Sequence, residues 1–269
     1  MQDELQRLRR AARQLIETDR VLAGEALAPG TVLPAQSAGP VQPAEPVRPA
    51  RTSTARGIPP PPDPKAFTGQ AKRKAAELEG LETNEVLGCT RCGLCRGRKN
   101  VVFGEGNPDA RLVFIGEGPG EEEDKQGRPF VGRAGELLTK MIRAMGLKRA
   151  DVYICNVIKC RAPGNRSPTA DEVAACWDHL VKQLKIIRPR VIAALGNPAT
   201  HALLHTTAGI SRLRGQWQSL PMLDADLADI KVMPTFHPAY LLRAYTPENR
   251  QKVWSDLQEV MRELGMPSK

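Results

Sequence analysis

Groups suited to chemistry occur where apolar segments of the chain end. A glycine-rich turn at 116–120 follows one such segment, Asn156 ends the next, and His237 follows the last. Glycines let backbone amides approach a ligand, an asparagine offers both a donor and an acceptor, and an imidazole can stabilise a developing negative charge. The carboxyl ends of parallel strands meet at one crevice, so we expect these groups to converge.

Cysteines provide the second set of groups. Cys89 and Cys92 form a C-x-x-C pair, which places two sulfurs on one metal centre within a single tight turn, and Cys160 and Cys176 follow later. Four thiolates from two chain segments suit tetrahedral zinc or an iron–sulfur cluster, and the softness of sulfur does not separate the two. The residues alone therefore predict a metal centre of either kind.

Two further cysteines stand outside that set. Cys95 extends the pair to a C-x-x-C-x-x-C run that could supply three ligands, whereas Cys155 lies in an apolar strand and is expected to be a buried thiol.

The chain shows no apolar signal region and no stretch long enough to span a bilayer, so we expect a cytoplasmic protein with no membrane contact. In that reducing compartment a disulfide framework is not expected.

The elements that must position these groups alternate between strand and helix. Apolar runs predict strands over 111–116, 151–157, 190–195 and 230–234. Helical spacing predicts helices over 135–145, 169–187, a short stretch from 198, and 247–264, with Thr169 and Glu172 forming a capping box. The expected fold class is α/β: a three-layer α/β/α sandwich around a central, mainly parallel four-stranded sheet.

The first third of the chain differs in composition. Residues 1–27 predict an amphipathic helix, a candidate docking element for a protein partner, and residues 28–64 hold 11 of the 23 prolines and predict a disordered Pro/Ala-rich linker. A connecting helix is predicted over 65–85, followed by the compact domain at 86–269.

After residue 88 the chain has 27 Lys and Arg against 19 Asp and Glu. This excess of positive charge suits binding to nucleic acid or simply solubility.

Five motifs occur in order along the compact domain. They are GEGPGEEED at 116–124, GRPFVG at 127–132, NVIKCR at 156–161, NRSP at 165–168 and HPAYLLR at 237–243. Together they resemble the family 4 (thermophile-type) uracil-DNA glycosylases over roughly residues 86–265. The resemblance implies an enzyme, expected as a monomer, that hydrolyses the N-glycosidic bond of deoxyuridine in DNA, releasing uracil and leaving an abasic site for base excision repair.

The resemblance also assigns the metal ligands. It implies that Cys89, Cys92, Cys160 and Cys176 hold a [4Fe-4S] cluster with a structural role, and it requires no ligand at Cys95.

The same resemblance points to a uracil pocket formed by Gly116, Glu117, Gly118, Phe130, Asn156 and His237. Phe130 lies in a loop bracketed by glycines and offers a face on which a flipped uracil stacks. Asn156 suits the O4 and N3–H pattern of uracil, and His237 would stabilise the departing anion at O2. Glu117 is expected to position water, with Glu123 as the weaker alternative, so the predicted catalytic residues are Glu117, Asn156 and His237.

Basic residues near these motifs are candidate contacts to DNA phosphates: Lys159, Arg161, Arg166, Arg214 and Arg243.

One rival to the glycosylase interpretation is a nucleotide- or flavin-binding module, but the glycine turn lacks the G-x-G-x-x-G spacing and no Walker lysine follows it. A second rival keeps the same fold but is a non-catalytic or crosslinking uracil binder. The third is a non-catalytic uracil- or nucleic-acid-binding iron–sulfur subunit of a repair or replication assembly.

Overall fold

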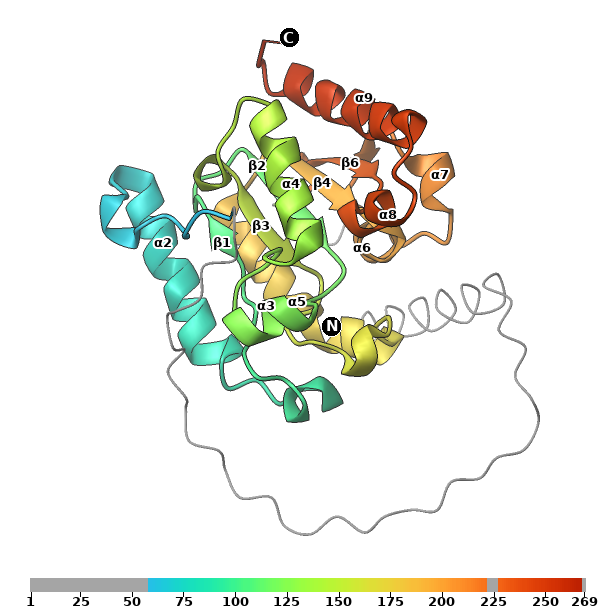
Figure 1. The fold of residues 1–269 in the computed structure, drawn as a ribbon. Coiled ribbons are helices and arrows are strands. Elements are labelled where there is room, and N and C mark those ends of the chain that lie inside the picture. Colours follow the sequence, from blue (N-terminus) through green and yellow to red (C-terminus); the bar gives the residue numbers. More distant parts are fainter. Residues whose placement is uncertain (1–57, 222–226, 268–269) are drawn as a thin grey trace, which may run out of the picture.

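The computed structural model describes residues 58–221 and 227–267 (Figure 1). The predicted helix at 1–27 and most of the 28–64 linker lie outside the described residues. The strands of the structure are β1 Glu105–Gly106, β2 Leu112–Gly116, β3 Tyr153–Asn156, β4 Val191–Leu195, β5 Gln218–Ser219 and β6 Lys231–Thr235. Its helices are α2 Gly69–Leu81, α3 Glu121–Gln126, α4 Arg133–Ala144, α5 Ala170–Ile187, α6 Gly196–Leu204, α7 Ile210–Leu213, α8 Pro238–Arg243 and α9 Pro247–Glu263.

The described strands form one six-stranded sheet in the order β1-β3-β2-β4-β6-β5. The four central strands are parallel, which confirms the predicted core, whereas β1 and β5 pair antiparallel at the two edges. Each edge strand has only two residues, too few for alternation of apolar residues to predict. The predicted four-stranded sheet is therefore extended by one short strand on each side.

Helices cover both faces of this sheet, as expected for an α/β sandwich (Figure 1). Alternate residues of each central strand enter two separate apolar clusters, one packed under α2, α5 and α6 and the other under α4, α8 and α9. Burial on both faces explains why β2 and β4 consist of apolar residues and glycine.

The predicted capping box starts α5, where Thr169 and Glu172 bond each other's backbone amides. No helix in the described part of the chain is long and apolar enough to cross a membrane.

The segment before residue 86 belongs to the packed core. Leu78 and Leu81 of α2 enter the apolar cluster under α5, and a π-helical turn at Glu82–Val86 continues the helix toward the cysteines. Ile58 is buried, and the Pro59 carbonyl accepts a hydrogen bond of 2.7 Å from an arginine side chain. Ile58 and Pro59, which composition assigns to the linker, thus contact the packed chain.

A buried lysine fixes α2 to α5. The Lys74 ammonium donates to the Ile187 carbonyl at the end of α5, at 2.7 Å, and to the Asp109 carboxylate at 2.6 Å. Burying this charge is tolerated because both acceptors are within hydrogen-bonding distance.

Replacing Lys74 with methionine removes both bonds and keeps the length of the side chain. We expect the melting temperature to fall, by the equivalent of about 1–3 kcal/mol in unfolding free energy, because the Ile187 carbonyl loses a buried donor. Thermal unfolding followed by circular dichroism measures the change. Lys72→Met, on the exposed side of the same helix, is the control. Equal shifts for the two variants would contradict the anchoring role of Lys74.

Candidate active site

Gly116 is the point at which the pocket residues meet. It is paired with Asn156 in the parallel register of β2 and β3, so both strands end side by side. A β-carbon at Gly116 would lie 2.5 Å from Asn156 Oδ1 and 2.5 Å from Phe130 Cζ. Only a residue without a side chain leaves room for this approach. The structure therefore brings together the glycine turn, the asparagine and the phenylalanine that the motifs assign to one site.

Phe130 has a backbone conformation that is rare for its residue type. Its φ is +51°, in the left-handed region, which costs about 1–2 kcal/mol for a residue with a side chain. The Glu123 carboxylate holds the residues that follow, because its Oε1 accepts from the amides of Val131 and Gly132 at 2.8 and 2.9 Å. Glu123 is therefore engaged in fixing the Phe130 loop, which argues against the alternative that it positions water.

Asn156 presents an unsatisfied acceptor to the pocket. Its side chain is 1% exposed, and Oδ1 has no hydrogen-bond donor among the described residues. A buried, unpaired amide oxygen costs free energy in the protein alone, so it indicates a position where a ligand donor would bind.

His237 stands beside Phe130 with a defined tautomer. The two rings are 5.6 Å apart at their centroids and inclined by 32°. His237 is the N-cap of α8, and its Nδ1 accepts from the Ala239 amide at 3.0 Å, which places the proton of the neutral ring on Nε2. Burial, assisted by the nearby charge of Arg243, lowers the pKa of His237 to about 4. The ring is therefore a neutral N–H donor at neutral pH.

Glu117 and Gly118 lie in the turn between β2 and α3, directly after Gly116. Both are half-buried, and the Glu117 carbonyl accepts from the Ile158 amide at 3.1 Å. This bond fixes the turn against the segment that leaves β3. The acidic run 121–124 starts helix α3 and places its negative charges at the helix N-terminus.

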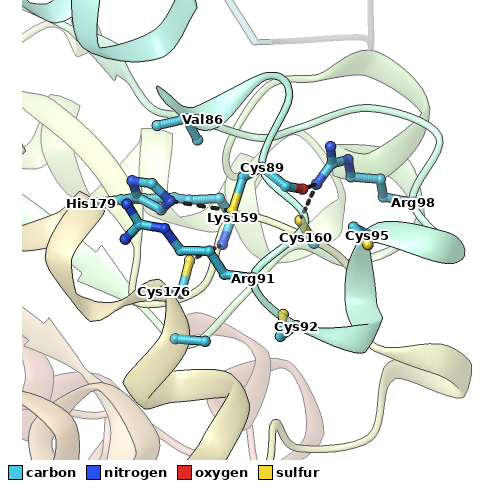
Figure 2. Close-up of a pocket in the computed structure, with 11 residues that line it drawn as sticks. Val86, Cys89, Arg91, Cys92, Cys95, Arg98, Lys159, Cys160, Cys176 and His179 are labelled. Carbon is cyan, nitrogen blue, oxygen red and sulfur yellow. Dashed lines mark hydrogen bonds between the residues drawn. The ribbon is translucent and has the colours of Figure 1, made fainter. Parts of the chain in front are cut away.

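A cavity of about 20 Å³, away from these residues, is lined by Cys89, Cys92, Cys95, Cys160 and Cys176 (Figure 2). The first two lie in the loop after Val86, Cys95 in the 3-10 turn Gly93–Arg96, Cys160 after β3 and Cys176 on α5. Within the described ranges, no three His, Cys, Asp or Glu side chains are grouped so as to hold a single metal ion. The five cysteines instead line one small cavity between the loop, the exit of β3 and α5.

Nitrogen donors approach three of these sulfurs (Figure 2). Arg98 Nη1 donates to Cys160 Sγ at 3.3 Å, the backbone amide of residue 159 donates to Cys176 Sγ at 3.3 Å, and His179 Nε2 lies 3.4 Å from Cys89 Sγ. Burial raises the pKa of the Cys160 thiol and raises that of Cys176 to about 12. These thiols would ionise only where a cation compensates the charge, as a metal does when it displaces the proton.

Comparisons with known proteins agree with this geometry. The Uracil DNA glycosylase superfamily matches residues 103–258. The chain is 50% identical to the Type-4 uracil-DNA glycosylase of Thermotoga maritima over 68% of this chain and 93% of that protein, and 43% identical to that of Archaeoglobus fulgidus over 68% and 92%. Identity to the Type-5 uracil-DNA glycosylase of Pyrobaculum aerophilum is 30%, over 51% of this chain and 64% of that protein. The chain belongs to the type-4 uracil-DNA glycosylases.

Membership of this family confirms the resemblance drawn from the five motifs. Iron–sulfur centres are generally associated with type-4 uracil-DNA glycosylases, and the cysteines that could hold one surround a common cavity here.

The candidate phosphate contacts of this type-4 glycosylase divide into two groups. Lys159 is 1% exposed, and its ammonium donates to the Asn156 carbonyl at 2.7 Å and to Gln183 Oε1 at 2.5 Å. The prediction that Lys159 contacts phosphate was therefore wrong. Arg214 is also directed inward, where it pairs with Asp256 and donates to the Lys252 carbonyl at 2.6 Å.

The remaining arginines stay accessible. Arg161 is partly exposed and bonds Asn165, Arg166 pairs with Glu172 while 44% of its side chain is exposed, and Arg243 is exposed at the end of α8.

Several residues of this glycosylase were missed by sequence reasoning. Arg98 and His179 approach the cysteine sulfurs, and Gln183 holds the buried lysine next to Asn156. His179 had a usable signal, because it lies three residues after Cys176 and so on the same face of α5. Arg98 had none, since only the folded loop returns it to the cysteines.

The pKa of His237 makes folding stability depend on pH. The unfolded chain protonates this ring near pH 6.5, whereas the folded chain does so near 4, so the unfolded state binds more protons between these values. Stability should therefore fall as pH drops from 7 to about 5. We expect the fall in melting temperature to be smaller in His237→Asn than in the unaltered chain. Identical falls would show that the ring is not protected from protonation.

Proposed function

We propose that the chain removes uracil from DNA by hydrolysing the N-glycosidic bond of deoxyuridine, with Phe130, Asn156 and His237 forming the uracil pocket. The observation that carries this proposal is the buried, unpaired Oδ1 of Asn156, which faces the same space as the Phe130 ring. Uracil is flat and carries an N3–H donor, so it would stack on the ring and satisfy that oxygen.

The orientation of the Asn156 amide sets the base preference. With Oδ1 accepting from N3–H, the Nδ2 group is left to donate to O4 of uracil. Cytosine presents an unprotonated N3 and an amino group at the same positions, so it would place acceptor against acceptor and donor against donor. Binding cytosine would leave buried groups unpaired, which strongly disfavours the wrong base.

His237 is suited to stabilise the leaving group. As the bond to the sugar breaks, negative charge develops on uracil and is shared by O2. A neutral Nε2–H donor, fixed by the bond from the Ala239 amide to Nδ1, would bind that charge without a proton transfer. Because its pKa is about 4, the ring keeps this form throughout the neutral range.

Glu117 is the carboxylate that we propose for the water and the sugar. It follows Gly116 directly, and Glu123 is already engaged with the Phe130 loop. A carboxylate at this turn would orient water and stabilise positive character on the deoxyribose as the base departs. We propose Arg161, Arg166 and Arg243 as contacts to the flanking phosphates, since these arginines remain accessible at the surface.

We also propose that Cys89, Cys92, Cys160 and Cys176 hold a [4Fe-4S] cluster. The donor set is thiolate, all four cysteines line one cavity, and nitrogen groups approach three of the four sulfurs. Iron held by these sulfurs would join the loop before β1 to the exit of β3 and to α5.

The six free cysteines fit a reducing compartment, and we propose a cytoplasmic monomer whose residues 1–27 bind a protein partner.

Serine substitutions test the cluster. Each of Cys89→Ser, Cys92→Ser, Cys160→Ser and Cys176→Ser should lower bound iron and sulfide from about four of each per chain and remove the broad visible absorbance of the protein. Cys95→Ser is the matched control, because Cys95 lines the same cavity and should leave the iron content unchanged. About one zinc per chain in place of iron would contradict the proposal.

Oligonucleotides test the activity. With one deoxyuridine in the strand, incubation followed by alkali should cut at that position, whereas strands with thymidine or deoxycytidine there should stay whole. Asn156→Ala and His237→Ala should each lower the single-turnover rate by about 10²–10³-fold, the usual loss for a donor that stabilises developing charge. Asn84→Ala, at an exposed position remote from the pocket, is the control. An intact uracil strand would refute the activity, and unaltered rates in both variants would refute the assigned pocket.

A further inference from the structure

Arg149 is a buried arginine that none of the roles above includes. It begins the 3-10 turn Arg149–Asp151 before β3 and is only 4% exposed. Its Nη2 donates to the Pro129 carbonyl at 2.9 Å, and its Nη1 donates to the Phe130 carbonyl at 3.2 Å and lies 3.3 Å from Thr139 Oγ1. One guanidinium thus binds two successive carbonyls of the loop that carries the pocket ring.

The charge of Arg149 is balanced by Glu105 of the edge strand β1. Glu105 Oε1 accepts from Arg149 Nε at 3.0 Å and from Nη2 at 2.5 Å, and its Oε2 accepts from Arg128 at 2.8 Å. A buried ion pair often contributes little net stability compared with apolar packing, and here two bonds to one carboxylate oxygen set the direction of the guanidinium. The arrangement therefore fixes where the loop carbonyls lie more than it strengthens the fold.

Phe130 needs such a constraint. Its left-handed backbone is unfavourable, and its carbonyl lies so close to helix α4 that a β-carbon at Gly135 would be 1.8 Å from the carbonyl oxygen. Arg149 binds this carbonyl from one side, while Glu123 binds the amides of the next two residues from the other. Without Arg149 the carbonyl would be a buried acceptor without its charged donor, and a relaxed loop would turn the ring.

We propose that Arg149, held by Glu105, is a positioning residue that sets the Phe130 ring at the angle needed to stack on uracil. The proposal rests on the stacking role proposed for Phe130. Within the described part of the chain, Arg149 donates to Glu105, Thr139 and two loop carbonyls, so its effect on the ring must pass through the loop backbone. Its loss should therefore be felt only while an aromatic ring is present at position 130.

A double-mutant cycle tests this dependence. Arg149→Met should weaken inhibition by free uracil about tenfold, as expected for the loss of a hydrogen bond from a charged group, with a matching rise in KM and a smaller fall in kcat. In a Phe130→Leu background the same substitution should change uracil inhibition by less than about twofold. Arg190→Met is the control, because it breaks an exposed ion pair with Glu263 at the start of β4, away from the carboxyl ends of the strands that carry Gly116 and Asn156.

Two outcomes would overturn the proposal: an equal loss in both backgrounds, which indicates general destabilisation, or no loss at all. If Arg149→Met is insoluble, Glu105→Gln and Thr139→Val are measured in the same cycle, and unchanged uracil inhibition in both would equally overturn it. Melting temperature and bound iron are recorded for every variant. Uracil release by the unaltered chain is measured in parallel, so that an inactive parent refutes the proposed function and an active parent with insensitive variants refutes only the role of Arg149.

Discussion

The pocket depends on the absence of a side chain at Gly116. The parallel register of β2 and β3 puts this glycine opposite Asn156, and the Phe130 ring fills the space that a β-carbon would need. Ring and amide can then face one flat ligand from two directions. The Phe130 loop and the end of β3 must both lie close to Gly116. Groups outside the pocket hold each of these two segments in place.

Three of those outer groups are cations directed into the fold, and two of them bind the backbone of a pocket residue. Lys159 binds the Asn156 carbonyl and Arg149 binds the Phe130 carbonyl. Arg214 pairs with Asp256, which also accepts from the Thr235 hydroxyl at 2.6 Å, two residues before His237. Part of the positive charge that composition suggests for DNA therefore lies inside the fold, where it positions the site.

Local pattern and the alternation of strands with helices are the parts of this fold that the sequence predicts. Apolar runs locate the four central strands, and the strand-end rule assigns Gly116, Asn156 and His237 to one edge of the sheet. The same reasoning could not predict β1 and β5, whose two residues carry no periodicity, or the inward direction of Lys159. A lysine beside cysteines and arginines resembles a surface charge, and only the packing of α5 against β3 brings Gln183 within reach.

Lys159 also joins the cysteine cavity to the pocket. Its backbone amide donates to Cys176 Sγ, and its carbonyl accepts from the Val102 amide at 2.8 Å, while its ammonium holds the Asn156 carbonyl. The Lys159 backbone is thus bonded to a cysteine of the cysteine cavity, and its side chain is bonded to the backbone of a pocket residue. Interiors are close-packed and transmit displacements, so a change in the spacing of the cysteine segments must reach Asn156. A metal centre held by Cys176 would thus be linked to the Asn156 backbone through this one residue.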